Sequence, residues 1–152
     1  MEIYKNILTN DFCDTLIEKI KNECVLSESH KTDWFVWLIW GQQGSQLLDR
    51  EKWNEEIYNM VINELSKFNF PKHKIMWLQM TEYKDGRWLR RHTDGAGNKT
   101  SIILLSNEFT GGDTYINDRV VNLEKGDGVV FAGGHQYHHK SFGSHKASHC
   151  WR

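Results

Sequence analysis

From Lys74 to the C-terminus, short segments in which apolar and polar residues alternate dominate the sequence. This period of two is typical of β-strands, and turn signals such as Asp85-Gly86 and Asn117-Asp118 separate the segments at short intervals. Many short strands joined by tight turns favour an antiparallel barrel or a jelly roll. The predicted strands are Ile75–Tyr83, Trp88–Asp94, Lys99–Leu105, Asp113–Ile116, Val120–Leu123, Gly128–Phe131 and His145–Trp151.

The part of the chain before Lys74 has the period of helices. A polar cap at Thr9-Asn10-Asp11 precedes apolar residues at helical spacing, namely Phe12, Leu16, Ile17, Ile20 and Cys24. A second helix is predicted over Arg50–Phe68, and an aromatic, β-branched strand over Trp34–Trp40, ended by Gly41 and Gly44. We therefore expect one mainly β (α+β) domain over residues 1–152, with helical support at about 9–70 and a β core at about 74–152.

Composition narrows the class of protein. A length of 152 residues allows one domain with a real core, and the net charge of −1 excludes a global basic field. Residues 71–152 are nevertheless cationic, with 12 basic and 8 acidic side chains. Cys13, Cys24 and Cys150 lack metal-type spacing and are interpreted as reduced thiols. With no apolar leader and no long apolar run, we expect a soluble cytoplasmic protein that does not bind membranes.

His92-Thr93-Asp94 is the strongest candidate for chemistry. Residues i and i+2 of an extended chain point to one face, so His92 and Asp94 can approach the same ion. A later histidine on a neighbouring strand completes two imidazoles and a carboxylate, the facial set of non-haem Fe(II) oxygenases. Alone, His92 also fits a packed core histidine and Asp94 a turn residue before Gly95.

The ordered residues together resemble the Fe(II)- and 2-oxoglutarate-dependent dioxygenases, especially the prolyl-4-hydroxylase-like branch. The matching residues are Leu78-Gln79, Tyr83-x-x-Gly86, Trp88, His92-x-Asp94, Ser101 to Ser106, Phe109-x-Gly111-Gly112, Gly126-Asp127-x-x-x-Phe131 and the late histidines. The resemblance implies a double-stranded β-helix (jelly-roll) core with the N-terminal helices packed on it. It also implies Fe(II) held by His92 and Asp94, with 2-oxoglutarate and O2 as co-substrates.

The third metal ligand has several candidates. By family spacing from the Gly-Asp turn, and with Tyr137 as the aromatic two positions earlier, the resemblance favours His139. His138 is the alternative, and His135 lies further back in the loop. Because adjacent residues of a strand face opposite ways, only one of His138 and His139 can reach the metal.

The far carboxylate of 2-oxoglutarate needs a cation, which in this family is an arginine or lysine on the last strand. The expected arginine is missing, so Lys146 is the first candidate, ahead of His145 and Arg152. The closing residues, Lys146 to Arg152, also resemble the final motif of the AlkB-type nucleic-acid demethylases, in which both terminal basic residues hold 2-oxoglutarate. This resemblance makes Arg152 a secondary candidate for that role, and an exposed C-terminal arginine is the alternative. Tyr83 stands where relatives place a phenol near the co-substrate.

The remaining features have structural and functional interpretations. Gly111-Gly112 and Gly126-Asp127 are interpreted as backbone turns, and Trp34, Trp37 and Trp40 as core residues or a substrate groove. Arg87, Arg90 and Arg91 form a solvated face or steer an anionic substrate. The resemblance implies hydroxylation of a peptidyl, most simply prolyl, residue of a peptide or protein, with release of succinate and CO2. An AlkB-like demethylase and a non-catalytic metal-binding β-barrel are the alternatives, and near-neutral charge disfavours nucleic acid.

Overall fold

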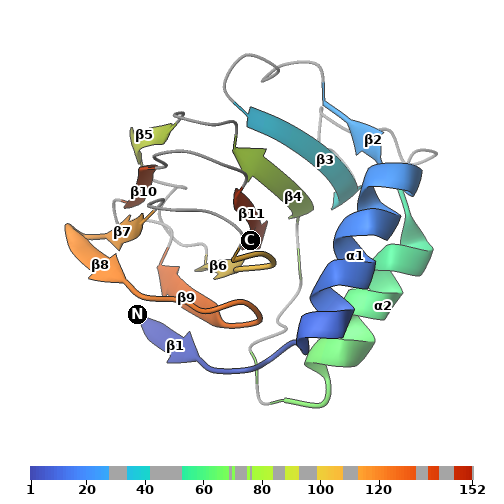
Figure 1. Ribbon diagram of the computed structural model, residues 1–152, viewed down its shortest axis with the longest axis horizontal. Coiled ribbons are helices and arrows are strands. Elements are labelled where there is room, and N and C mark those ends of the chain that lie inside the picture. Colours follow the sequence, from blue (N-terminus) through green and yellow to red (C-terminus); the bar gives the residue numbers. More distant parts are fainter. Residues whose placement is uncertain are drawn as a thin grey trace.

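The computed structural model describes residues 1–27, 34–41, 53–68, 70, 75, 77–83, 88–92, 99–107, 113–132, 137–140 and 146–151. For residues 34, 88–92, 113, 137–140 and 146–151 it describes the backbone alone. Within this part of the chain, two helices and two antiparallel sheets form (Figure 1). The mainly β class predicted from the sequence is confirmed. No helix among the described residues is long and apolar enough to span a membrane.

The larger sheet has seven strands in the order β1-β9-β6-β11-β4-β3-β2. Every neighbouring pair that joins them is antiparallel. The strands are β1 (Glu2–Tyr4), β2 (Val25–Leu26), β3 (Trp34–Gly41), β4 (Trp77–Tyr83), β6 (Lys99–Ile103), β9 (Gly128–Ala132) and β11 (Lys146–Trp151). The first three strands come from the N-terminal half, so this half contributes to the sheet as well as the helices.

The smaller sheet has four antiparallel strands in the order β5-β10-β7-β8. They are β5 (Trp88–His92), β7 (Asp113–Ile116), β8 (Arg119–Val121) and β10 (Tyr137–Lys140). An apolar cluster joins the two sheets: Ile102, Val129 and Phe131 of the larger sheet contact Ile116 and Val121 of the smaller one. The two sheets therefore face each other across a shared core.

Helices α1 (Asn10–Glu23) and α2 (Glu55–Leu65) lie on the other side of the larger sheet (Figure 1). The Thr9 hydroxyl accepts a hydrogen bond from the Phe12 amide at 3.1 Å and caps α1, as the sequence predicts. Asn54 caps α2 in the same way. Each helix buries its apolar stripe against β3 and β4. The buried side chains that form this core include Leu16, Ile20, Ile57, Val61, Leu65, Trp37, Ile39, Leu78 and Met80.

The tryptophans of β3 support the core interpretation where their side chains are described. Trp37 is buried in the cluster under the helices. Trp40 stacks on Tyr58 with ring centroids 4.7 Å apart and contacts Trp53 at 5.2 Å. Apolar burial of this kind is the main favourable term in folding. The side chain of Trp34 lies outside the described residues.

The second helix is shorter than predicted. It begins after Asn54, where the side chain caps it, and Ser66 to Phe68 form a turn instead of continuing it. Phe68 is 40% exposed, so the apolar stripe that predicted a longer helix ends at Leu65. Arg50, where the predicted helix starts, lies outside the described residues.

Strand boundaries shift at several places. The turn Asn117-Asp118 has positive φ at both residues, so Arg119 pairs with Ile116 and the strand begins one residue before the predicted Val120. Alternation did not predict β1, β2 or β10. Strands β1 and β2 are only three and two residues long. In β10 (Tyr-His-His-Lys), Tyr137 is the one residue with a large apolar surface, so apolar and polar residues do not alternate.

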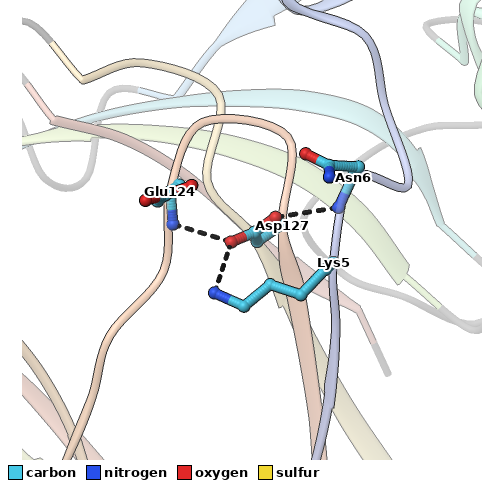
Figure 2. Close-up of polar contacts among 4 residues, drawn as sticks. All are labelled: Lys5, Asn6, Glu124 and Asp127. Atoms are coloured by element: carbon cyan, nitrogen blue, oxygen red, sulfur yellow. Dashed lines mark hydrogen bonds and ion pairs between the residues drawn. The ribbon is translucent and has the colours of Figure 1, made fainter.

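Gly126-Asp127 does more than reverse the chain. The Asp127 side chain is fully buried and accepts hydrogen bonds from the amides of Asn6 at 2.8 Å and Glu124 at 2.9 Å (Figure 2). Its Oδ2 also accepts a hydrogen bond from the Lys5 ammonium, with Nζ and Oδ2 2.9 Å apart. Gly126 has φ +91°, and its carbonyl accepts from the amides of Ile7 and Leu8. The turn interpretation is therefore incomplete, because these bonds fasten the segment after β1 to the sheet.

Candidate metal centre and co-substrate site

Two of the predicted metal ligands lie on paired strands, β5 and β10. His92 is the last residue of β5, and its Cα lies opposite that of Tyr137 on β10. His139 follows two positions later and pairs with Leu89. Neighbouring strands of a sheet are about 4.8 Å apart, and His139 lies two residues along β10 from the partner of His92, so the two residues occupy the same part of the strand pair. Asp94 lies just beyond β5, outside the described residues, as do His135, His145 and Arg152.

The two adjacent histidines of β10 occupy different rows of the smaller sheet. The row of His139 continues through Thr114 and Val121, whose side chains are both 4% exposed. The row of His138 continues through half-buried Tyr115 to Val120, which is 46% exposed. Residues directly opposite one another in antiparallel strands share a face. The register position of His139 is thus in a buried row, and that of His138 is in a solvent-facing one.

Buried hydroxyl groups lie on the faces that the sheets turn toward each other. Thr114 lies two residues before the core residue Ile116 on β7, and Thr100 lies two residues before Ile102 of the same apolar cluster on β6, so each threonine shares a face with a core residue. A hydroxyl inside a core is costly unless it is hydrogen-bonded, so polar residues in these positions suggest a polar site. The sequence prediction missed both threonines as functional candidates. The signal was present, since alternation alone places each of them on the apolar face of its strand.

β4 carries a polar row that ends at Tyr83. Trp77 Nε1 donates to Gln79 Oε1 at 2.6 Å, and Gln79 Nε2 donates to Thr81 Oγ1 at 3.3 Å. Tyr83 continues this i, i+2 series and is 3% exposed. Leu78 and Met80, on the other parity, pack with the helices. The row from Trp77 to Tyr83 therefore lines the face turned toward the smaller sheet.

Two predicted co-substrate residues are neighbours in register. Lys146, the first residue of β11, pairs with Tyr83, the last residue of β4. The sequence gives no hint of this pairing, because more than sixty residues separate the two along the chain. A phenol and an ammonium carried by adjacent strand ends can both serve as donors to one carboxylate.

The two cysteines whose side chains the structure describes lie away from these strands. Cys13 and Cys24 belong to α1 and its C-cap. Burial raises the pKa of the Cys13 thiol to about 11 and that of Cys24 to about 12. Both stay protonated near neutral pH, so neither is a ready metal ligand. Within the described residues, which do not include Asp94, no group of three His, Cys, Asp or Glu forms a metal site.

Solved structures share this arrangement of sheets and helices. An oxidoreductase of the 2OG-Fe(II) oxygenase family from Burkholderia pseudomallei matches with a TM-score of 0.70 and 17% identity, covering 97% of this chain and 79% of that one. The viral collagen prolyl hydroxylase of Paramecium Bursaria Chlorella virus-1, solved as a 2OG complex, matches at 0.62 with 14% identity, over 99% and 93% of the two chains.

A third match is a prolyl hydroxylase from Trichoplax adhaerens, in complex with a peptide fragment of the hypoxia inducible factor oxygen degradation domain. Its TM-score is 0.66 and its identity 14%, over 99% of this chain and 81% of that one. No protein-family model and no curated protein sequence matches this chain. The chain thus has the fold of the 2OG-Fe(II) oxygenases and prolyl hydroxylases, and the resemblance predicted from its sequence is confirmed at the level of the fold.

Proposed function

We propose that this chain is an Fe(II)- and 2-oxoglutarate-dependent dioxygenase that hydroxylates a peptidyl, most simply prolyl, residue. The observation that carries the proposal is the position of His92 and His139 on two paired strands, with His139 in a row of the sheet that is otherwise buried. The strand orders β9-β6-β11-β4 and β5-β10-β7-β8, all antiparallel and face to face, are those expected of a double-stranded β-helix. The shared fold with 2OG-Fe(II) oxygenases points the same way.

The donor set fits a ferrous ion. The proposed ligands are His92, Asp94 and His139: two neutral imidazoles and one hard carboxylate, with no thiolate that would select a softer metal. His139 is preferred to His138 because its register position is in the buried row with Thr114. Three protein ligands on one side leave the other positions for 2-oxoglutarate and O2.

Lys146 and Tyr83 are proposed to hold the far carboxylate of 2-oxoglutarate. Their register pairing puts one cation and one phenol at the same level of adjacent strands, and the Tyr83 side chain is buried. Away from bulk water, a charge-assisted hydrogen bond is stronger and orients the co-substrate. Arg152 remains the second candidate for the cation.

When bound, the ferrous ion supplies the redox chemistry by which O2 decarboxylates 2-oxoglutarate to succinate and CO2 and hydroxylates a substrate C–H bond. The protein's share is to bind, orient and exclude water. Lys146 and Tyr83 would hold the co-substrate, and the apolar cluster that includes Phe131 keeps water out of part of the core between the sheets. A peptidyl substrate is proposed because two of the structural matches are prolyl hydroxylases, one of them peptide-bound.

Succinate formation tests the proposal. The purified chain with Fe(II), ascorbate and 2-oxoglutarate should release succinate, and a substrate peptide should stimulate the release. Asp94→Ala should abolish it, while Asp14→Ala, which removes an exposed carboxylate of α1, should not. Stimulation by a methylated oligonucleotide instead of a peptide would indicate a demethylase. Absence of both turnover and 2-oxoglutarate binding would indicate a non-catalytic barrel.

A further inference from the structure

An irregularity in β5 places two arginines beside the proposed metal centre. His92 pairs with Tyr137, and Leu89 pairs with His139. Between these pairs β10 has one residue, His138, whereas β5 has two, Arg90 and Arg91. This two-against-one count is a β-bulge, a feature that is common at sheet edges and beside active sites, where it redirects side chains.

The bulge lies in an end strand of the smaller sheet. β5 is the end strand of the smaller sheet and has one neighbouring strand, β10, among the described residues (Figure 1). The row that Arg90 and Arg91 share with His138 continues through Tyr115 to the exposed Val120. The bulge therefore lies at the edge of the sheet, in the register row that leads to Val120, and Arg91 is one residue from His92.

Charges around the bulge are not balanced in register. Neither β5 (Trp-Leu-Arg-Arg-His) nor β10 (Tyr-His-His-Lys) contains a carboxylate, and the nearest in register, Asp113 of β7, pairs with Lys140.

We propose that the Arg90–Arg91 bulge is a docking site for an acidic peptide segment of the substrate, next to the residue that is hydroxylated. The inference rests on the proposed function and adds a substrate class to it. Guanidinium groups bind carboxylates through paired hydrogen bonds, and two adjacent arginines suit a segment with neighbouring Asp or Glu residues. A peptide is favoured over nucleic acid because the basic residues form a local site on a chain of net charge −1.

Peptide binding tests the inference without requiring turnover. Fluorescence anisotropy would compare three labelled peptides with a central proline flanked by Asp and Glu, by Asn and Gln, or by Lys. The acidic peptide should bind at least about tenfold more tightly than the neutral one, and the preference should shrink as salt rises. Equal binding of acidic and neutral peptides would overturn the inference, as would preferential binding of an oligonucleotide.

Charge reversal locates the site. Arg90→Glu with Arg91→Glu should remove the preference for the acidic peptide and create one for the Lys peptide. The matched control, Lys99→Glu with Arg119→Glu, changes the net charge equally at exposed positions of β6 and β8 and should keep the acidic preference. If both variants lose it alike, the effect is one of global charge and the inference is wrong. If the reversed variant does not fold, as judged by circular dichroism, the double Gln variant replaces it and should bind acidic and neutral peptides equally.

The succinate assay separates the two proposals. Succinate formation with no acidic preference leaves the dioxygenase proposal standing and rejects the docking site. Acidic binding that depends on Arg90 and Arg91, in a protein that neither binds nor converts 2-oxoglutarate, rejects the dioxygenase proposal and keeps the docking site.

Discussion

Lys146 and Tyr83 lie directly opposite each other on antiparallel strands β11 and β4. The pair ends the polar row of β4, on the face turned toward the smaller sheet. Both residues stood out in the sequence for separate reasons, one as a substitute for a missing arginine and the other as a phenol near the co-substrate. Their pairing makes them parts of one proposed carboxylate site.

Lys146→Ala should raise the 2-oxoglutarate concentration needed for half-maximal succinate formation. Loss of a charge-assisted hydrogen bond costs about 1.5–3 kcal/mol, so the expected increase is roughly ten- to a hundredfold. Tyr83→Phe, which removes only the hydroxyl, should give a smaller increase. Lys67→Ala, at an exposed pair with Glu64, is the control and should leave the requirement unchanged. If Arg152→Ala has the large effect and Lys146→Ala none, the cation is Arg152.

Replacing His138 and His139 of β10 one at a time should show which of the two is the metal ligand. His139→Ala should lose Mn(II) affinity by more than tenfold, because it removes a proposed metal ligand whose register position is in the buried row. His138→Ala, in the row that leads to exposed Val120, should bind Mn(II) as the parent does. Isothermal titration with Mn(II), which replaces Fe(II) without oxidising, measures both. The reverse order of affinities would assign the role to His138, and two unaffected variants would move the third ligand elsewhere.

Asp127→Asn should destabilise the fold by about 2 kcal/mol, since a buried carboxylate loses charge-assisted hydrogen bonds. Burial by itself would raise the pKa of this carboxyl, but the amides of Asn6 and Glu124 and the Lys5 ammonium outweigh burial, so the pKa is lowered. A lowered folded pKa stabilises the protein above the unfolded value of about 3.9, and this contribution disappears as pH falls through the folded pKa.

The difference in unfolding free energy between the parent and Asp127→Asn should therefore be full near neutral pH and shrink below about pH 4. Urea unfolding at several pH values measures it. Asp14→Asn, which removes an exposed ion pair with Lys125, should change stability by less than about 1 kcal/mol. A difference that persists unchanged in acid would mean that Asp127 acts through packing and not through its charge.

Two glycines of the same turn should differ in their tolerance of alanine. A Cβ on Gly126 would lie 2.2 Å from the Leu8 carbonyl oxygen, at a φ of +91°, so Gly126→Ala should cost about 3 kcal/mol or more. At Gly128 the nearest atom is the end of the Ile7 side chain, at 2.7 Å, which can move, so Gly128→Ala should cost about 1 kcal/mol. Thermal melts of both variants compare them, and equal melting temperatures would contradict this account of the turn.

Local patterns predicted most elements because local physics determines them. The cap at Thr9 and the stripe Ile57-Val61-Leu65 are visible in the sequence, and so is the exact extent of β7. Elements that depend on distant partners were missed. β10 is polar along its whole length and becomes a strand because β5 and β7 pair with it from both sides.

The same distinction applies to the candidate site. Spacing singled out His92 with Asp94, and the family resemblance singled out His139, Tyr83 and Lys146, but only strand register shows which of them are on paired strands. Asp127 was interpreted as a turn residue because nothing near it in the sequence reveals that Lys5 and Asn6 approach it. Thr100 and Thr114 were passed over because a threonine in a strand is ordinary until burial shows which face it occupies.

A crystal structure with Mn(II) and a non-reactive 2-oxoglutarate analogue tests the central claim most directly. We expect one ion bonded to a His92 nitrogen, an Asp94 oxygen and a His139 nitrogen, with the analogue chelating it and its far carboxylate at Lys146. If His92 and Asp94 diverge and no imidazole of β10 lies within coordination distance of an ion beside them, the proposed metal centre does not exist.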